Sequence, residues 1–367
     1  AVVMSGNYVQ RGEPAIIDKF KRAQAAVYGG ADIVIELPMP FSCQNAEMFA
    51  LAAIKELSKV NIDSLSFGCE TDDIDILEKI AQIQLTPEYN KLMKAEMKKG
   101  LSYPKAMSNV LKSVLNEDSK AVSYPNNVLA VEYMKSAIKL NLKLKNYPVK
   151  RLGMGHNETE ITGPFHSATA IRNFLLKGTF SNLKLTEKSL EVIEKFYMDH
   201  KKFNTLNNYM DYLYYRIITC DDLTGIYEIR EGLDNKILSQ VYKHDRIDDL
   251  IMSLKSKRYT YSKLRRCLLN ILLDIKKFDI NKFMLIDHDY IKVLAFNNRG
   301  RQVIKDARNN GIRVINRYSD YRKYNLAPEK LERFKITNVS SNIYYLPLKN
   351  RKLNSEYTEN AVFVDIG

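Results

Sequence analysis

The sequence predicts an α/β protein whose first part is a parallel sheet with helices on both faces. Two apolar runs, residues 1–4 and 33–37, have the length of buried strands. The amphipathic segment between them begins at Pro14, which suits a first helical turn, and ends at Gly29-Gly30. Strand, crossover helix and strand form a βαβ unit, so a binding site is expected at the carboxyl ends of parallel strands.

The pattern of residue types along the chain changes twice after this part. From 183 to about 277 glycines are scarce and no short Val/Ile-rich run appears, which indicates a helical region. Strand-like runs return after residue 289. Because 367 residues are too many for one ordinary core, we expect a sheet domain over 1–180, a helical domain over 181–285 and a small C-terminal α/β subdomain over 286–367.

Several classes of protein are excluded by composition. No apolar run approaches the roughly 18 residues of a membrane span, and no leader opens the sequence. These observations predict a cytoplasmic protein with no membrane partner, and we expect no stable protein partner. The cysteines are scattered without CxxC pairing, so neither a zinc knuckle nor a disulfide framework is expected. They are Cys43, Cys69, Cys220 and Cys267.

The positive charge is concentrated in the second half of the chain. The net charge is +13. Residues 1–180 hold 22 Lys and Arg against 19 Asp and Glu, whereas residues 181–367 hold 34 against 24. This asymmetry favours a polyanion partner for the C-terminal part. The same asymmetry is equally well explained if the source organism has Lys-rich proteins in general, in which case the charge does not indicate a binding partner.

Two glycines lie where strands of the predicted sheet end. A polar loop from Gly6 to Glu13, which includes Asn7, follows the first strand. The run 64–68 reads as a further strand that ends in Gly68. A glycine at this edge lets a ligand ring or phosphate approach the backbone closely. A plain turn glycine is an equally open interpretation of Gly68.

Two polar groups further along suit a nucleotide. Tyr124-Pro125-Asn126-Asn127 opens a helix, where an Asn can cap the helix or offer its carboxamide to a nucleotide. A strand over about 143–152 ends near Arg151, whose fixed fork of donors suits phosphate or carboxylate oxygens.

A third helix start combines hydroxyls with a cation. Ser167 and Thr169 open a helix, and Arg172 extends from its first turn. Hydroxyls and free N–H groups at a positive helix end can hold phosphates while pyrophosphate leaves. A helix cap with an exposed arginine accounts for the same residues, and the residues alone do not decide between the two.

A basic and aromatic segment stands out in the helical region. It spans 255–266, and its candidate RNA contacts are Lys257, Arg258, Tyr259, Tyr261 and Arg265. Basic groups neutralise phosphates, and tyrosines can stack on unpaired bases. A solvated helix face with tyrosines packed inward is the alternative, and the residues alone favour it.

Six separated blocks of the sequence resemble the tRNA(Met) cytidine acetate ligase family, a relative of the adenylyltransferases with a His-x-Gly-His signature. The blocks are 5–15 with 31–38, Pro125-Asn126-Asn127-Val128-Leu129, Arg151, 167–172, 231–235 and 256–265. The resemblance runs from Ala1 to about Arg322. In that family a strand and a loop reading roughly Glu-Tyr-Asn-Pro-Phe-His-Asn-Gly-His come before the first block, and here the sequence starts within what resembles the second strand.

The resemblance implies a Rossmann-like nucleotidyltransferase fold and a two-step reaction. ATP and acetate would form acetyl-adenylate and pyrophosphate, and the acetyl group would pass to N4 of the wobble cytidine of elongator tRNA(Met). Magnesium on the phosphates is expected, and no acyl-carrying Cys or Ser is needed. The resemblance implies ATP contacts at Gly68, Asn126 and Arg151, to which we add Gly6 and Asn7. It favours phosphate binding by Ser167, Thr169 and Arg172, and RNA binding by the segment 255–266.

Two other classes of function stay open at this point. One is an enzyme that adenylylates a small molecule, for which the basicity of the second half would be incidental. The other is an RNA-binding protein without catalysis, if the His-x-Gly-His loop is truly missing. Fold resemblance alone does not separate these alternatives.

Overall fold

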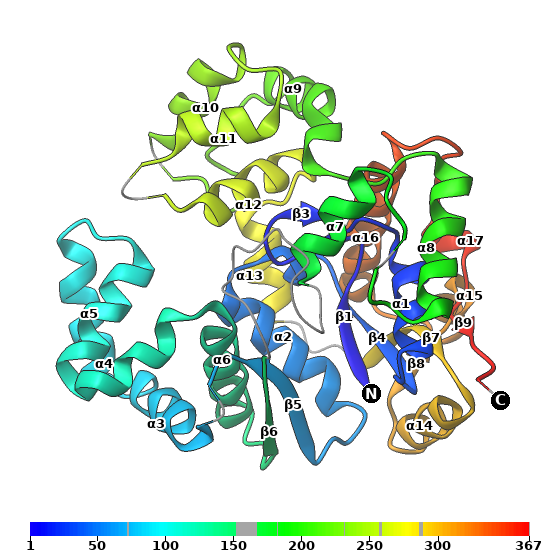
Figure 1. The fold of residues 1–367 in the computed structure, drawn as a ribbon, viewed down its shortest axis with the longest axis horizontal. Coiled ribbons are helices and arrows are strands. Elements are labelled where there is room, and N and C mark those ends of the chain that lie inside the picture. Colours follow the sequence, from blue (N-terminus) through cyan, green and yellow to red (C-terminus); the bar gives the residue numbers. More distant parts are fainter. Residues whose placement is uncertain are drawn as a thin grey trace.

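The computed structural model describes residues 1–71, 73–151, 167–181, 183–230, 232–256, 259–285 and 289–366. In the view of Figure 1 most of the strands lie in the lower half of the molecule, and a lobe of helices lies above them. The lobe consists of α9 (Met210–Ile218), α10 (Leu233–Val241), α11 (Ile247–Leu254) and α12 (Tyr261–Leu272).

The larger sheet joins strands from both ends of the chain. Its strands are β1 (Val2–Ser5), β4 (Ile33–Leu37), β7 (Tyr290–Phe296), β8 (Arg313–Ile315) and β9 (Val362–Phe363). β4 pairs in parallel with β1 and antiparallel with β7, and β7 pairs in parallel with β8 and β9. The sheet is therefore mostly parallel, as the sequence predicts, with one antiparallel pair.

The expected βαβ unit is present, but its helix begins later than predicted. α1 (Lys19–Tyr28) connects β1 to β4, and the Asp18 carboxylate caps it by accepting a hydrogen bond of 2.9 Å from the Lys21 backbone N–H. Pro14 lies in β3 (Glu13–Pro14), which pairs antiparallel with β2 (Tyr8–Val9). The predicted start at Pro14 is wrong, because the fixed φ of proline suits an edge strand as well as a helix.

A second, smaller sheet consists of two parallel strands, β5 (Ser64–Cys69) and β6 (Lys145–Lys150). Five helices accompany it: α2 (Ala46–Ser58), α3 (Ile74–Gln84), α4 (Pro87–Lys98), α5 (Tyr103–Leu115) and α6 (Pro125–Lys139). Among the described strands, β1 pairs only with β4 and β5 only with β6. The single sheet that the sequence suggested is therefore divided in two.

Helices cover both faces of the larger sheet, which confirms the predicted layer order. Val34 of β4 belongs to a cluster with Phe20 and other side chains of α1. Its neighbours Ile33 and Ile35 point the other way and belong to a cluster with Ile304 of α14 (Asn298–Asn309). Successive residues of a strand face opposite sides, so β4, whose residues are all buried, lies between two layers of helices.

The largest core cluster lies mainly in the helical region. Its helices include α7 (Ala168–Leu176), α8 (Glu187–His200), α9 to α12 and α13 (Lys277–Leu285). The same cluster contains Tyr8, Ile17 and Cys43 from the first part of the chain and Tyr344 from α16 (Pro328–Tyr345). The helical region thus shares its core with both ends of the chain.

The C-terminal residues differ most from their expected arrangement as a small subdomain over 286–367. β7, β8 and β9 extend the sheet begun by β1 and β4. The remaining helices there are α15 (Tyr318–Lys323), α16 and α17 (Ser355–Thr358). Hydrogen-bonded pairing of β7 with β4 makes this segment part of the first sheet, a long-range pairing that local sequence patterns do not reveal.

Among the described residues, 3₁₀ helices span Phe41–Cys43, Asn116–Ser123 and Leu206–Tyr209. Cys43, Cys69 and Cys267 are buried, Cys220 is partly exposed, and all four are free thiols. Within the described ranges, no helix has the length and apolar character needed to cross a membrane.

Candidate active site

Buried polar contacts hold the loop after β1 in place. The Asn7 carboxamide accepts a hydrogen bond of 2.9 Å from the Lys19 backbone N–H and donates one of 3.1 Å to the Ser341 hydroxyl. A Cβ on Gly6 would lie 2.6 Å from Oε1 of Glu36. Both predicted ligand residues are buried, so Asn7 uses its side chain to shape the loop, and Gly6 is required by packing.

A network of buried charges lies beneath this loop. The Lys19 ammonium is 2.7 Å from Glu36 and 2.5 Å from Glu356. Lys292 also contacts both carboxylates. Burial alone would raise the pKa of Glu356, but Lys19 and Lys292 outweigh it and lower this pKa to about 2. The network joins α1 and β4 to β7 and α17, which explains how C-terminal residues support an N-terminal loop.

The carboxyl ends of β5 and β6 bring three of the predicted ATP contacts together. Gly68 pairs with Val149, and the Arg151 backbone N–H donates to Cys69 O at 2.9 Å. Gly68 and Arg151 are both exposed. Among the described residues, a Cβ on Gly68 would meet only Cγ of Arg151, at 4.0 Å. The described part of the fold therefore leaves room for a side chain at Gly68, and its packing does not explain the glycine.

Glu70 joins this edge to the start of α6 and was missed by sequence reasoning. Its carboxylate accepts a hydrogen bond of 2.6 Å from the Asn126 carboxamide and one of 3.0 Å from the Asn127 backbone N–H. In return, Asn127 Oδ1 accepts hydrogen bonds from the backbone N–H groups of Glu70, at 2.8 Å, and Thr71, at 3.2 Å. Asn126 is thus fixed beside Gly68 and Arg151. The sequence feature that could have identified Glu70 is an acidic residue just after a strand, in a chain that also has a Pro-Asn-Asn helix start.

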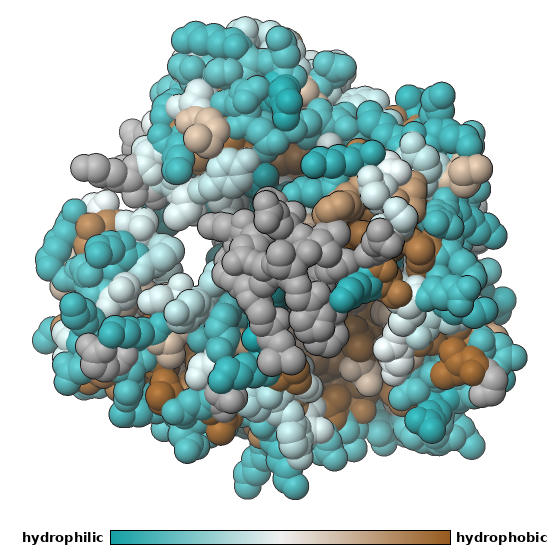
Figure 2. Space-filling view, viewed as in Figure 1, coloured by the Kyte–Doolittle hydropathy of each residue, from teal (hydrophilic) through white to brown (hydrophobic). Residues whose placement is uncertain are grey.

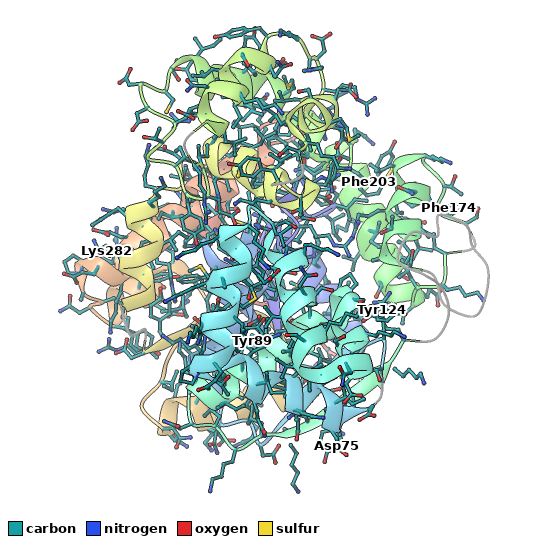
Figure 3. All side chains as sticks on the ribbon, turned by 90° about the vertical axis from the view of Figure 1, so that its left-hand side faces the viewer. Asp75, Tyr89, Tyr124, Phe174, Phe203 and Lys282 are labelled. Atoms are coloured by element: carbon teal, nitrogen blue, oxygen red, sulfur yellow. The ribbon has the colours of Figure 1, made fainter. Side chains whose placement is uncertain are left out.

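Figure 3 labels Tyr124, which precedes α6, and Phe174 of α7 on the same side of the molecule. Ser167 caps α7 by accepting a hydrogen bond of 3.0 Å from the Ala170 backbone N–H. Thr169 and Arg172 lie within the helix and are partly buried. The predicted helix start is confirmed, and its cap is the Ser167 hydroxyl.

Positive charge gathers around the loop after β1. Arg22 donates from Nη1 to Ser5 O at 3.0 Å and Gly6 O at 2.8 Å. Burial lowers the pKa of Arg172, and the neighbouring Arg11 lowers it further. Burial also lowers the pKa of Arg22, and Arg172 adds to this effect. Arg11, Arg172 and Arg22 therefore lie close enough to one another to concentrate positive charge near this loop.

The predicted RNA contacts fall into three groups. Lys257 and Arg258 lie outside the described residues. Tyr259 is partly buried, with the Lys263 ammonium 5.1 Å from its ring centroid. Tyr261 and Arg265 form an internal network with Asp248 on α11 and with Glu13. Figure 2 shows mainly hydrophilic side chains over the lobe that carries this segment.

The contacts of this network are close. The Tyr261 hydroxyl donates to Oδ1 of Asp248 at 2.7 Å, and the Arg265 guanidinium lies 3.3 Å from the same oxygen. Arg265 also forms an ion pair with Glu13. Burial lowers the pKa of Arg265 to about 10, with a further contribution from Arg11. Tyr261 and Arg265 therefore stabilise the fold, whatever else they bind.

Comparisons with known proteins agree over almost the whole chain. The family model described as HIGH Nucleotidyl Transferase matches residues 1–360. The tRNA(Met) cytidine acetate ligase of Clostridium perfringens (strain ATCC 13124) is 34% identical over 97% of this chain and 89% of its own length. The enzyme of the same name from Thermoanaerobacter sp. (strain X514) is 35% identical over 96% of this chain and 88% of its own length. The chain belongs to the tRNA(Met) cytidine acetate ligase family.

The fold of the chain is that of a solved member of this family. The apo crystal structure of Thermotoga maritima TmcAL has a TM-score of 0.92 at 29% identity, covering 99% of this chain and 92% of the other. A second TmcAL structure, bound with alpha-thio ATP, has a TM-score of 0.90 at 28% identity and covers 99% of this chain and 91% of the other. The predicted nucleotidyltransferase-like fold is confirmed.

Proposed function

We propose that the protein is an ATP-dependent ligase that activates acetate and transfers the acetyl group to N4 of the wobble cytidine of elongator tRNA(Met). The observation that carries this proposal is the match, over nearly the whole chain, to relatives named tRNA(Met) cytidine acetate ligase. The ATP analogue in the TmcAL structure supports ATP as the activating nucleotide. We also propose a cytoplasmic location, because the tRNA substrate is found there.

The geometry favours one orientation of ATP. The positive N-terminus of α6 is already filled by the Glu70 carboxylate, so a phosphate there would meet a like charge. We therefore assign the nucleoside to Gly68, Asn126 and Arg151, and the triphosphate to the start of α7, with Arg172 beside it. Ser167 and Thr169 lie at that helix start. The loop at Gly6 and Asn7 borders the site through its backbone.

The reaction needs charge stabilisation and orientation more than covalent help from the protein. In the first step an acetate oxygen attacks the α-phosphorus of ATP, and the bond to pyrophosphate breaks. In the second step N4 attacks the acetyl carbonyl carbon, the bond to AMP breaks, and N4 loses a proton. Arginine side chains held in a partly buried site can stabilise the charge that develops on the phosphates.

Magnesium is expected on the phosphates of ATP. Over the described ranges, no cluster of three or more His, Cys, Asp or Glu side chains could hold a metal ion. A protein cage for the metal is therefore not part of the proposal, and no step above depends on one. Magnesium commonly keeps several waters and binds through substrate phosphates.

The test is acetate-dependent exchange of pyrophosphate into ATP. It should be run on this chain and on a chain with the family's upstream strand and His-x-Gly-His loop placed before Ala1. Exchange in either chain, followed by acetylation of a tRNA(Met) transcript, supports the proposal. Tight tRNA binding without exchange in either chain would contradict it and favour a non-catalytic RNA-binding protein. Exchange that needs another acid and ignores tRNA would favour a small-molecule adenylyltransferase.

A further inference from the structure

The hairpin of β2 and β3 rests directly on the backbone of α12. Its turn closes with a hydrogen bond of 2.9 Å from Gly12 N–H to Val9 O. Gly12 has φ +77°, and a Cβ there would lie 2.6 Å from Arg266 N and 2.8 Å from the carbonyl carbon of Arg265. A contact this close leaves no room for the turn to move toward the helix.

A polar bridge beside this contact ties the hairpin to two helices of the lobe. Glu13 pairs with Arg265, and Arg265 in turn lies 3.3 Å from Asp248 of α11. Arg265 also donates to the Tyr261 hydroxyl at 3.0 Å, and its guanidinium lies 4.3 Å from the ring centroid of Tyr261. The Glu13 and Arg265 side chains are only 20% and 21% exposed, so solvent screens their pairing less than that of a surface pair.

The base of the same hairpin is anchored at the end of β1. The Tyr8 ring is completely buried, 6.5 Å from the ring of Tyr209 and 6.1 Å from that of Tyr344 between centroids. The Ala15 backbone N–H donates to Asn7 O at 2.9 Å. The hairpin therefore links the loop after β1 to Arg265 and Arg266, at the C-terminal end of the basic segment 255–266.

We propose that Glu13 is a positioning residue that acts through Arg265, holding the RNA-binding segment in the correct place relative to the site where acetate is activated. This inference rests on the proposed function. The second step requires N4 of the cytidine to reach the acetyl carbonyl carbon while each substrate is held by a different part of the chain. Displacement by about 1 Å can lower the rate of such a step on the order of a hundredfold.

The bridge is tested with Glu13→Gln, which keeps the shape of the side chain and removes its charge. The matched control is Glu228→Gln, because Glu228 pairs with the neighbouring Arg266 at 2.9 Å without touching the hairpin network. Glu13→Asp tests rescue by charge. Three quantities are measured in whichever of the two chains exchanges pyrophosphate: exchange without tRNA, acetyl transfer at saturating tRNA, and tRNA affinity.

For Glu13→Gln we expect exchange and tRNA affinity to stay within about threefold of the parent chain, and the rate of transfer to fall roughly tenfold or more. Glu13→Asp should recover part of the transfer rate. Glu228→Gln should leave the ratio of the exchange rate to the transfer rate unchanged. An equal loss of exchange and transfer, or the same split in Glu228→Gln, would overturn the inference. A loss of tRNA affinity with a normal rate at saturation would also overturn it, since it indicates direct RNA contact.

A second measurement separates this inference from the proposed function. Hydrogen exchange of the amides of residues 8–14 is followed with and without a tRNA(Met) transcript. We expect tRNA to slow this exchange in the parent chain and to have a smaller effect in Glu13→Gln. An equal effect in the parent chain and in Glu13→Gln would overturn the inference, even if neither of them catalyses pyrophosphate exchange. Failure of the proposed function, in contrast, is judged from pyrophosphate exchange and acetyl transfer in the parent chain alone.

Discussion

The carboxylate of Glu70 and the side-chain amide of Asn126, 56 residues apart in sequence, are joined by a hydrogen bond of 2.6 Å. With the 3.0 Å bond to the Asn127 backbone N–H, Glu70 both caps α6 and fixes the carboxamide that we assign to the nucleoside. The same contact thus stabilises a helix and shapes the candidate ATP site, and these two roles can be separated by comparison with an ordinary cap.

Glu70→Ala should lower both stability and ATP affinity. The control is Asp73→Ala, because Asp73 caps α3 by accepting from the Ile76 backbone N–H at 3.1 Å. Loss of either cap should reduce the free energy of unfolding by about 1 kcal/mol, as measured by urea denaturation. Glu70→Ala should also raise the KM for ATP about tenfold, the scale of one lost hydrogen bond to a charged group. Similar KM values in the two variants would leave Glu70 as a cap alone.

Gly68→Ala should affect ATP binding without destabilising the fold. Within the described part of the chain, a Cβ at this position meets only the Arg151 side chain, at 4.0 Å, so the free energy of unfolding should not fall. If a ligand approaches the Gly68 backbone, the added methyl group should cost on the order of 1–3 kcal/mol of binding. The KM for ATP and the thermal midpoint are measured together. An unchanged KM would favour the plain turn glycine that the sequence left open.

The sequence was most informative where the contacts are local. The two strands within residues 1–37, the helix starts at Pro125 and near Ser167, and the helical region follow from periodicity and capping, whereas the helix start expected at Pro14 does not. Contacts between distant residues were not predictable in this way. The pairing of β7 with β4, the Glu70 clamp and the ion pair of Glu13 with Arg265 each depend on the tertiary fold, and an acidic residue in a loop has many possible partners.

Gly12→Ala should destabilise the protein more than a glycine substitution of equal backbone strain. Gly12 and Gly100 both have φ +77°, but no atom of the described residues lies within 4 Å of a Cβ built on Gly100. Gly100→Ala should therefore cost only the strain of a left-handed residue, about 1–2 kcal/mol. Gly12→Ala should cost about 1–3 kcal/mol more, because its methyl group collides with the backbone of α12. Equal losses in chemical denaturation would mean that the hairpin can move away from α12.

Glu356→Gln should change how stability depends on pH. The pKa of Glu356 is lowered from 4.5 to about 2 in the folded protein, because Lys19 and Lys292 outweigh its burial. A carboxylate with a lowered pKa stabilises the fold above its unfolded pKa, and this stabilisation is lost as the pH falls toward the folded pKa. The parent chain should therefore lose stability between about pH 5 and pH 2 more steeply than Glu356→Gln.

At neutral pH the same variant leaves Lys19 and Lys292 without one of their two carboxylate partners. Removing one member of a buried ion pair costs on the order of 3–5 kcal/mol, so the free energy of unfolding of Glu356→Gln at pH 7 should fall by about that amount. Glu47→Gln is the control, because Glu47 pairs with Lys139 at 2.8 Å with its side chain 53% exposed. Loss of such a pair should cost less than about 1 kcal/mol. Equal losses in the two variants, or parallel pH curves for Glu356→Gln and the parent chain, would show that the buried network does not hold the loop after β1 in the way described.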